Sequence, residues 1–203
     1  LCPLCRGSFE VDFDDETYLL GGTFRISLRR KQLTEIPKIP HALRRRIISL
    51  DLGENNLRTV TSTSFDGMTN LSYLNLSWSI SHETALNDTC PIASDAFSRL
   101  SGLKELILSS NPIRVLHKDM FKGLSKLKSL SLFNIWVDAL PDGIFDPLLD
   151  LVELRLCDNK ITSVPAGIFR NLGKLSTLHF CHNKITELCS GFSQGLKTLK
   201  HLS

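Results

Sequence analysis

The chain has 203 residues, of which 42% are hydrophobic and 22% are charged, and its formal net charge is +3. This balance excludes an intrinsically disordered chain and leaves enough apolar side chains for a large core. No stretch of the sequence approaches the run of roughly 18 apolar residues that indicates a membrane-spanning helix.

Residues 1–46 come before any repetition and are predicted to form an N-terminal cap. The end unit of a repetitive core must cover the first exposed edge of that core and turn polar groups outward. Within this segment, residues 8–13 alternate between polar and apolar side chains, which predicts a strand with one apolar face. We expect Cys2 and Cys5 to close a small disulfide ring, because the βαβ pattern of a redox-active Cys-x-x-Cys pair does not surround them.

The same segment is rich in basic residues, and Glu35 is the only acidic residue between positions 25 and 46. Such a concentration of positive charge is either an ordinary solvated surface or a site for a polyanion such as a glycosaminoglycan. The candidates for polyanion binding are Arg29, Arg30, Lys31, Arg44, Arg45 and Arg46.

From Ile47 onward, apolar residues recur in the spacing L-x-x-L-x-L-x-x-N-x-L, and a Phe follows in most units. The last two leucines alternate with polar residues, which predicts a short strand that is buried on one face only. A single strand of this kind cannot bury its leucines, so neighbouring units must stack with the Phe side chains beneath them. The pattern predicts an α/β solenoid, a leucine-rich-repeat horseshoe with a parallel β-sheet on its concave side.

The repeat divides the chain into units of nearly constant length. The units cover residues 47–70, 71–102, 103–126, 127–150, 151–174 and 175–198, and residues 199–203 begin a further, truncated repeat. The Asn after each strand is expected to hydrogen-bond backbone groups where the chain turns away from the sheet. Ser79 and Ile135 replace this Asn, so we expect local irregularity at both positions.

The second unit carries an insertion within 79–93, which is either a plain surface loop or a side wall of the binding face.

These repeats, together with the Leu-Thr-Glu-Ile-Pro ending of the cap at 33–37, resemble the variable lymphocyte receptors of jawless vertebrates and similar proteins of basal chordates. Toll-like receptor ectodomains and matrix leucine-rich proteoglycans share the repeat. The cap departs from this pattern, because such caps usually carry more cysteines than Cys2 and Cys5. The resemblance implies a non-catalytic immune recognition module that binds microbial surface molecules or protein antigens on its concave face.

An extracellular location is expected, either secreted or on the outer face of the plasma membrane. The sequence contains glycosylation acceptors at Asn70, Asn75 and Asn87, and its 6 cysteines can pair completely. Any membrane attachment is expected only through a C-terminal anchor beyond Ser203.

The outward-facing positions of the repeat supply the predicted ligand-binding residues. They are Asp51, Glu54, Tyr73, Trp78, Glu105, Ile107, Ser129, Ser131, Phe133, Glu153, Arg155, Asp158, His179 and His182. Acidic residues outnumber Arg155, which predicts an acidic strip for cationic or hydroxyl-rich partners, unless the carboxylates only keep the surface soluble. The exposed aromatic residues favour binding. A glycan on Asn75 would obstruct this face.

Cys157 and Cys181 occupy the same position in consecutive repeats. Adjacent strands lie about 4.8 Å apart, within the Cα separation of roughly 4.4 to 6.8 Å that a disulfide tolerates, so a bridge between them is geometrically possible. Together with Asp158, His179 and His182 they are chemically capable of binding zinc, but repeat spacing alone does not give tetrahedral geometry, and no metal is predicted.

No catalytic motif is found, and the chain is expected to be neither an enzyme nor a cofactor-binding protein. Nucleic acid is not an expected partner. The alternative function is that of a matrix or adhesion protein, or a signalling-receptor ectodomain, which binds a glycosaminoglycan or a host protein through the basic cap.

Overall fold

The computed structural model describes residues 22–81 and 90–203. The expected Cys2–Cys5 disulfide, the strand at 8–13 and the Asn87 acceptor lie outside these residues. In the described part, no helix is long and apolar enough to cross a membrane.

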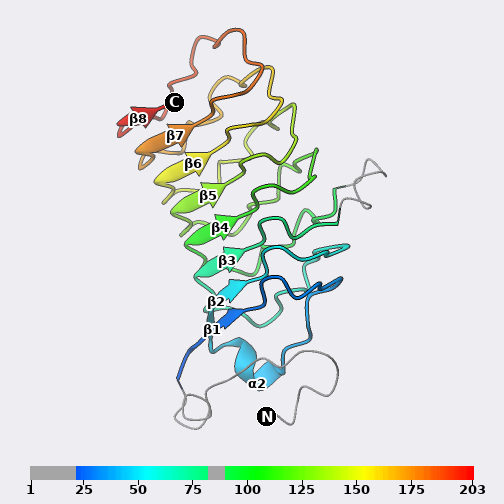
Figure 1. Ribbon diagram of the computed structural model, residues 1–203. Helices are drawn as coiled ribbons and strands as arrows, with labels where there is room; N and C mark the ends of the chain where they lie inside the picture. Colours follow the sequence, from blue (N-terminus) through cyan, green and yellow to red (C-terminus); the bar gives the residue numbers. More distant parts are fainter. Residues whose placement is uncertain (1–21, 82–89) are drawn as a thin grey trace.

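One parallel sheet of 8 strands runs along the whole stack, and its strands follow one another in chain order (Figure 1). The only helix in the described part is the single turn α2, His41–Arg44. The strands are β1 Phe24–Ser27, β2 Ile47–Asp51, β3 Tyr73–Asn75, β4 Glu105–Ile107, β5 Ser129–Ser131, β6 Glu153–Arg155, β7 Thr177–His179 and β8 His201–Leu202. The predicted leucine-rich-repeat solenoid is confirmed.

The register of the sheet follows from the leucine spacing. The central leucine of each strand pairs with that of the next, from Leu50 to Leu74 and onward to Leu178. Because side chains alternate along a strand, this register buries every central leucine and turns its two neighbours outward. β1 lies within the predicted cap, and it pairs with β2 with a shift between Phe24 and Arg25. The cap segment therefore supplies the first strand of the sheet.

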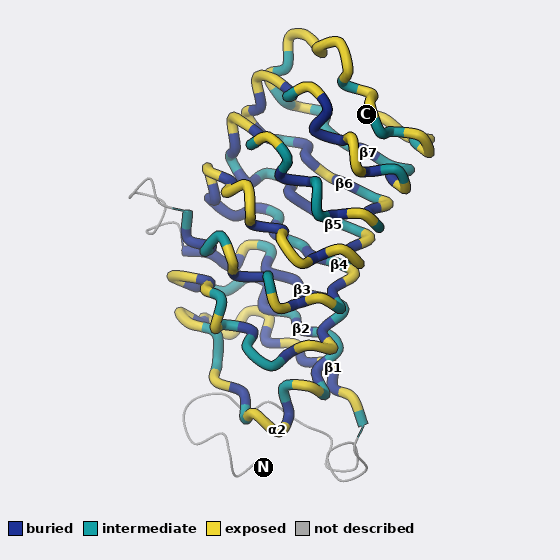
Figure 2. The backbone as a smooth tube through the Cα atoms, turned by 180° about the vertical axis from the view of Figure 1, so that it is seen from behind, coloured by how far each residue is buried: buried dark blue, intermediate teal, exposed yellow. Residues whose placement is uncertain are grey.

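A column of phenylalanines fills the core behind the sheet. The rings of Phe121 and Phe145 stack with centroids 6.3 Å apart, and those of Phe145 and Phe169 are 6.2 Å apart. Phe65 and Phe97 stack in the same way at 6.1 Å. The buried residues run through the interior of the stack, and the exposed residues lie along its outer turns (Figure 2).

The asparagine ladder forms as predicted, and each amide serves two repeats. Asn111 accepts hydrogen bonds from the backbone N–H groups of Ser79 and Ile80, each at 2.9 Å. Its amide nitrogen donates to Leu76 O at 2.7 Å and Leu108 O at 2.8 Å. The turn at Ser79 is therefore satisfied by the following repeat, and Ser79 adds a hydrogen bond from its hydroxyl to Leu76 O.

The irregularity expected at Ile135 appears in the preceding repeat. An Asn side chain at position 135 would have accepted hydrogen bonds from the turn of that repeat, and Ile135 cannot do so. Ile135 is fully buried, and its own backbone N–H donates to Asn159 Oδ1 at 3.0 Å. In the preceding repeat, the Ile113 N–H donates to Asn111 O at 2.9 Å, which closes a tight local turn in place of the missing ladder bond. The strand register on either side of Ile135 is undisturbed.

One residue before each ladder position adopts a left-handed backbone conformation. These residues are Glu54, Trp78, Ser110, Asn134, Asp158 and His182, with φ between 51° and 57°. Residues other than glycine rarely adopt this backbone conformation, so the turn that follows each strand is held in place by the ladder hydrogen bonds around it. These residues form a row just beyond the strand ends.

Candidate functional site

The outward face of the sheet carries two columns of side chains that the register places side by side. One column runs through Ser49, Tyr73, Glu105, Ser129, Glu153 and Thr177. The other runs through Asp51, Asn75, Ile107, Ser131, Arg155 and His179. Of the remaining predicted ligand-binding residues, Glu54, Trp78, Asp158 and His182 lie in the left-handed row, and Phe133 immediately precedes that row.

Tyr73 lies at the centre of the acidic part of this face. Burial raises the pKa of the Tyr73 hydroxyl, and the neighbouring carboxylates of Asp51 and Glu105 raise it further. Asp51 accepts hydrogen bonds from Gly53 N at 2.8 Å and from the Asn75 amide at 3.0 Å. Within residues 22–81 and 90–203, Glu105 forms no ion pair. Two carboxylates therefore surround one half-buried tyrosine, and Glu105 keeps its charge available.

A small hollow of about 210 Å³ adjoins Tyr73 on the side where the strands begin. Arg25, Ile48, Ser49 and Ser72 line it together with Tyr73. Tyr73 therefore lines a hollow together with Arg25 and also lies within the electrostatic influence of Asp51 and Glu105, so a ligand placed over it would meet both signs of charge.

The predicted acidic strip is not continuous toward the C-terminal repeats. Glu153 is bound by Arg155, whose Nε donates to the carboxylate at 2.7 Å, and the Ser129 hydroxyl donates to it at 3.3 Å. Asp158 pairs with His182 Nδ1 at 3.0 Å. The expectation of an acidic strip from Asp51 to Asp158 was wrong in this respect, because Arg155 on the same strand and His182 in the next repeat pair with these carboxylates.

Glu54 is neutralised at the N-terminal end of the face. The guanidinium groups of Arg29 and Arg30 both donate to its carboxylate. The hydrogen bond from Arg30, followed by that from Arg29, lowers the pKa of Glu54 to about 2. This cluster links the end of β1 to the end of β2.

We expect the Glu54 carboxylate to titrate near pH 2 when its side-chain NMR signal is followed against pH. In an Arg30→Gln variant the pKa of Glu54 should rise toward its ordinary value of 4.5, since the ionised form loses its strongest hydrogen bond. An unchanged pKa in the variant would show that Arg30 is not the partner that stabilises the ionised form.

A larger pocket, of about 520 Å³, lies beyond the ends of β2 and β3. It is lined by Glu54, Asn55, Asn56, Trp78 and Ile80. The Trp78 side chain is 55% exposed. A large exposed aromatic beside a concavity of this size is a typical anchor for a ligand or for one side chain of a protein partner.

The basic residues of the cap do not form one surface. Arg29 and Arg30 follow β1 and are bound to Glu54. Arg46 lies at the opposite end of β1, where it donates to Gly22 O at 2.7 Å and stacks over the Phe24 ring. Arg44 is occupied by backbone carbonyls, at 2.7 Å from Ile39 O and 3.1 Å from Asp66 O. Of the predicted group, only the Lys31 and Arg45 side chains are free of such bonds, and polyanion binding by the cap stays a prediction.

Cys157 and Cys181 form a disulfide between neighbouring repeats, with their Cα atoms 4.7 Å apart. Both thiols are therefore unavailable to a metal, and no group of three or more potential ligands exists in the described part of the chain. His179 instead bonds the Ser203 hydroxyl at 2.7 Å. Cys90 and Cys189 are free thiols.

Mass spectrometry of an unreduced tryptic digest should recover Cys157 and Cys181 in linked peptides, whereas Cys189 should react with an alkylating reagent.

Two of the predicted glycosylation acceptors differ in accessibility. Asn75 is 4% exposed, its amide nitrogen donates to Asp51, and its amide oxygen accepts from Ser77 N at 2.9 Å. Burial of Asn75 and its hydrogen bonds disfavour a glycan there and favour the alternative that this acceptor is unused. Asn70 is exposed at the edge where the strands begin, and a glycan there stays a prediction.

The chain is similar to a known protein family and to solved structures. A family model described as leucine rich repeat matches residues 25–79, 91–134 and 150–203. Similar solved structures comprise 332 chains. One is the crystal structure of a TLR13–ssRNA13 complex, with 31% sequence identity and a TM-score of 0.72, and the match covers 80% of this chain and 22% of that chain. The chain therefore spans less than a quarter of the TLR13 chain. A search of curated proteins finds no match.

Proposed function

Because the chain belongs to the leucine-rich-repeat family, we propose that it is a non-catalytic recognition module that binds its partner on the outward face of the sheet. The arrangement of Asp51, Tyr73 and Glu105 carries this proposal. Three neighbouring strands place a half-buried aromatic ring between two carboxylates, one of which has no ionic partner among the described residues. An aromatic anchor beside an unpaired charge is typical of binding surfaces.

The partner that fits this surface is cationic or rich in hydroxyl groups. Glu105 can pair with a partner's positive charge, and the Tyr73 hydroxyl and Ser49 can exchange hydrogen bonds with it. Microbial surface molecules and protein antigens satisfy this chemistry, and an extracellular immune role agrees with the resemblance to variable lymphocyte receptors. The similarity to TLR13 supports a role in innate recognition at the level of the fold.

Binding of the labelled chain to a panel of heat-killed bacteria tests the proposal. We expect a combined Tyr73→Ala and Glu105→Gln variant to bind the recognised strain about tenfold or more weakly, as loss of a central aromatic and an unpaired charge usually does. Glu153→Gln is the matched control, because Glu153 lies in the same column but is already paired with Arg155.

Equal binding by the double variant and the parent would contradict the central site. A larger loss of binding in Glu153→Gln than in the double variant would indicate that the binding site lies nearer the C-terminal repeats. Failure to bind any strain in the panel would contradict the microbial partner. Circular dichroism of each variant establishes that the fold is retained.

Nucleic acid is retained as a second candidate, because the TLR13 structure is a complex with ssRNA13. The expectation that nucleic acid is excluded therefore has no support. A polyanion would be repelled by Glu105 and attracted by the hollow beside Arg25. Consequently, Glu105→Gln should strengthen binding of a labelled single-stranded polyuridylate if this candidate is correct, and it should weaken binding of the partner proposed above.

A further inference from the structure

We propose that the edge of the sheet at which β4 to β8 begin binds a linear sulfated polysaccharide. This surface, termed the lysine edge, is separate from the outward face and from the cap residues considered above. Its members are Lys104, Lys126, Lys128, Lys174 and Lys200, all of which are exposed.

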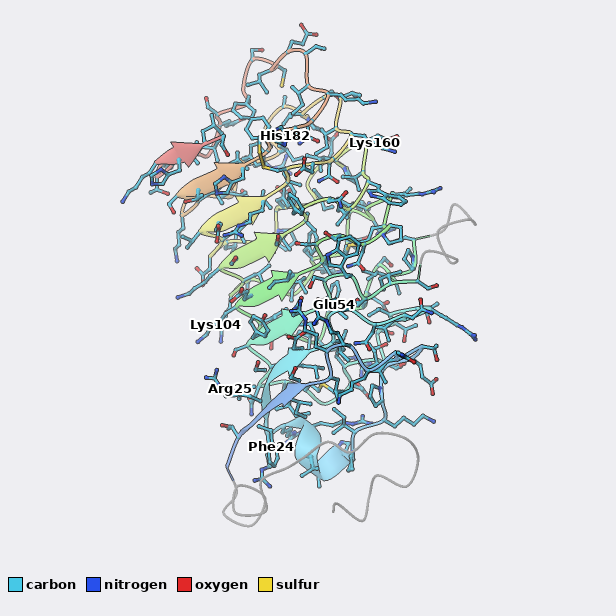
Figure 3. All side chains as sticks on the ribbon, viewed as in Figure 1. Phe24, Arg25, Glu54, Lys104, Lys160 and His182 are labelled. Carbon is cyan, nitrogen blue, oxygen red and sulfur yellow. A yellow bond between two sulfur atoms is a disulfide. The ribbon has the colours of Figure 1, made fainter. Side chains whose placement is uncertain are left out.

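Backbone hydrogen bonds place the lysine edge in register. The Lys128 N–H donates to Lys104 O, and the Val152 N–H donates to Lys128 O, each at 2.8 Å. The series of backbone hydrogen bonds continues with the Ser176 N–H, which donates to Val152 O at 2.9 Å, and the Lys200 N–H, which donates to Ser176 O at 2.8 Å. With about 4.8 Å between strands, the row from Lys104 to Lys200 spans about 19 Å. Lys104 lies on the same side of the sheet as Arg25, where the strands begin (Figure 3).

One acidic residue, Asp150, is surrounded by this group. Lys174 Nζ lies 2.6 Å from the Asp150 carboxylate, and this contact, followed by the fields of Lys174, Lys128 and Lys126, lowers the pKa of Asp150. Within the described ranges, Lys104, Lys126, Lys128 and Lys200 form no ion pair. Positive charges gathered in this way repel one another in the free protein, so an anionic partner relieves a cost that is already present.

The shape of the row selects a linear polymer. Successive cations are separated by about one or two strand spacings of about 4.8 Å, so a chain with repeated negative charges can meet several of them at once. Single-stranded nucleic acids additionally need aromatic side chains on which bases stack. Residues 101–104, 125–128, 149–152, 173–176 and 197–200, which form this edge, contain no Phe, Tyr or Trp. Exposed Leu149 and Val152 lie between the lysines and offer sugar rings an apolar contact.

Heparin is the probe, and its affinity for the chain can be measured by surface plasmon resonance at several salt concentrations. A combined Lys104→Gln, Lys126→Gln and Lys128→Gln variant should bind heparin about tenfold or more weakly, and the salt dependence should be shallower, since fewer ion contacts remain to be screened. The matched control is Lys118→Gln, Lys160→Gln and Lys184→Gln, which removes the same charge from exposed lysines elsewhere. The control should bind as the parent does.

Three outcomes would overturn the proposal. Equal losses in the two triple variants would show that only net charge matters, and unchanged affinity in the edge variant would show that the edge is not used. Equal binding of heparin and de-sulfated heparin would contradict recognition of sulfate. Tighter binding of polyuridylate or polyglutamate than of heparin would assign the edge to nucleic acid or to acidic protein segments. Because neither triple variant changes Asp51, Tyr73 or Glu105, the result is independent of the bacterial-binding experiment.

Discussion

Replacement of Phe145 by Ala is expected to lower the free energy of unfolding by about 4 kcal/mol, in the middle of the range for removal of a buried aromatic side chain. Phe145 is fully buried and is stacked against Phe121 at 6.3 Å and Phe169 at 6.2 Å. Its loss leaves a cavity between two rings that are held in place by their own repeats, so the surrounding chain cannot collapse to fill the space. Urea unfolding followed by circular dichroism measures the change.

Phe133→Ala is the appropriate control for this prediction. Phe133 is 38% exposed on the outward side, and its truncation should cost no more than about 1 kcal/mol. If the Phe145 and Phe133 variants lost similar stability, the column of phenylalanines would not be the main support of the stack. Phe133→Ala also tests binding separately, since it removes a predicted ligand contact without disturbing the core.

Replacement of Asn111 by Ala should lower the free energy of unfolding by about 3 kcal/mol, because it leaves buried backbone groups without partners. The Ser79 and Ile80 N–H groups lose their acceptor, and the carbonyls of Leu76 and Leu108 lose a donor. The Ser79 hydroxyl keeps its hydrogen bond to Leu76 O but does not replace the acceptor that the two N–H groups lose. Urea unfolding again provides the measurement.

Asn56→Ala is a matched Asn-to-Ala control, since Asn56 is exposed and makes no side-chain hydrogen bond in the described part of the chain. We expect its stability to remain within about 0.5 kcal/mol of the parent. A small effect for Asn111→Ala as well would mean that the turn at Ser79 can find other partners, as the turn before Ile135 does. Hydrogen exchange at the Ser79 and Ile80 amides would then show whether local protection is lost without global destabilisation.

The repetition in the sequence was sufficient to predict the fold. Leucines at fixed spacing can be buried only if strands pair in register, and that requirement predicts the parallel sheet, the phenylalanine column and the asparagine ladder. The spacing also predicted which residues face outward, and it brought Cys157 beside Cys181. The signal that was missed is equally periodic: Lys104, Lys128 and Lys200 share the position just before a strand, which aligned repeats reveal.

The sequence by itself thus determined the solenoid and the identity of its outward columns, because both depend only on the period of the repeat. The tertiary structure alone decided which charges on those columns are free. Arg155 neutralises Glu153, two arginines bind Glu54, and the Asn75 amide is buried against Asp51. Long side chains can reach several charged neighbours, both in their own strand and in adjacent repeats. Which neighbour they bind depends on side-chain distances that the repeat period alone does not specify.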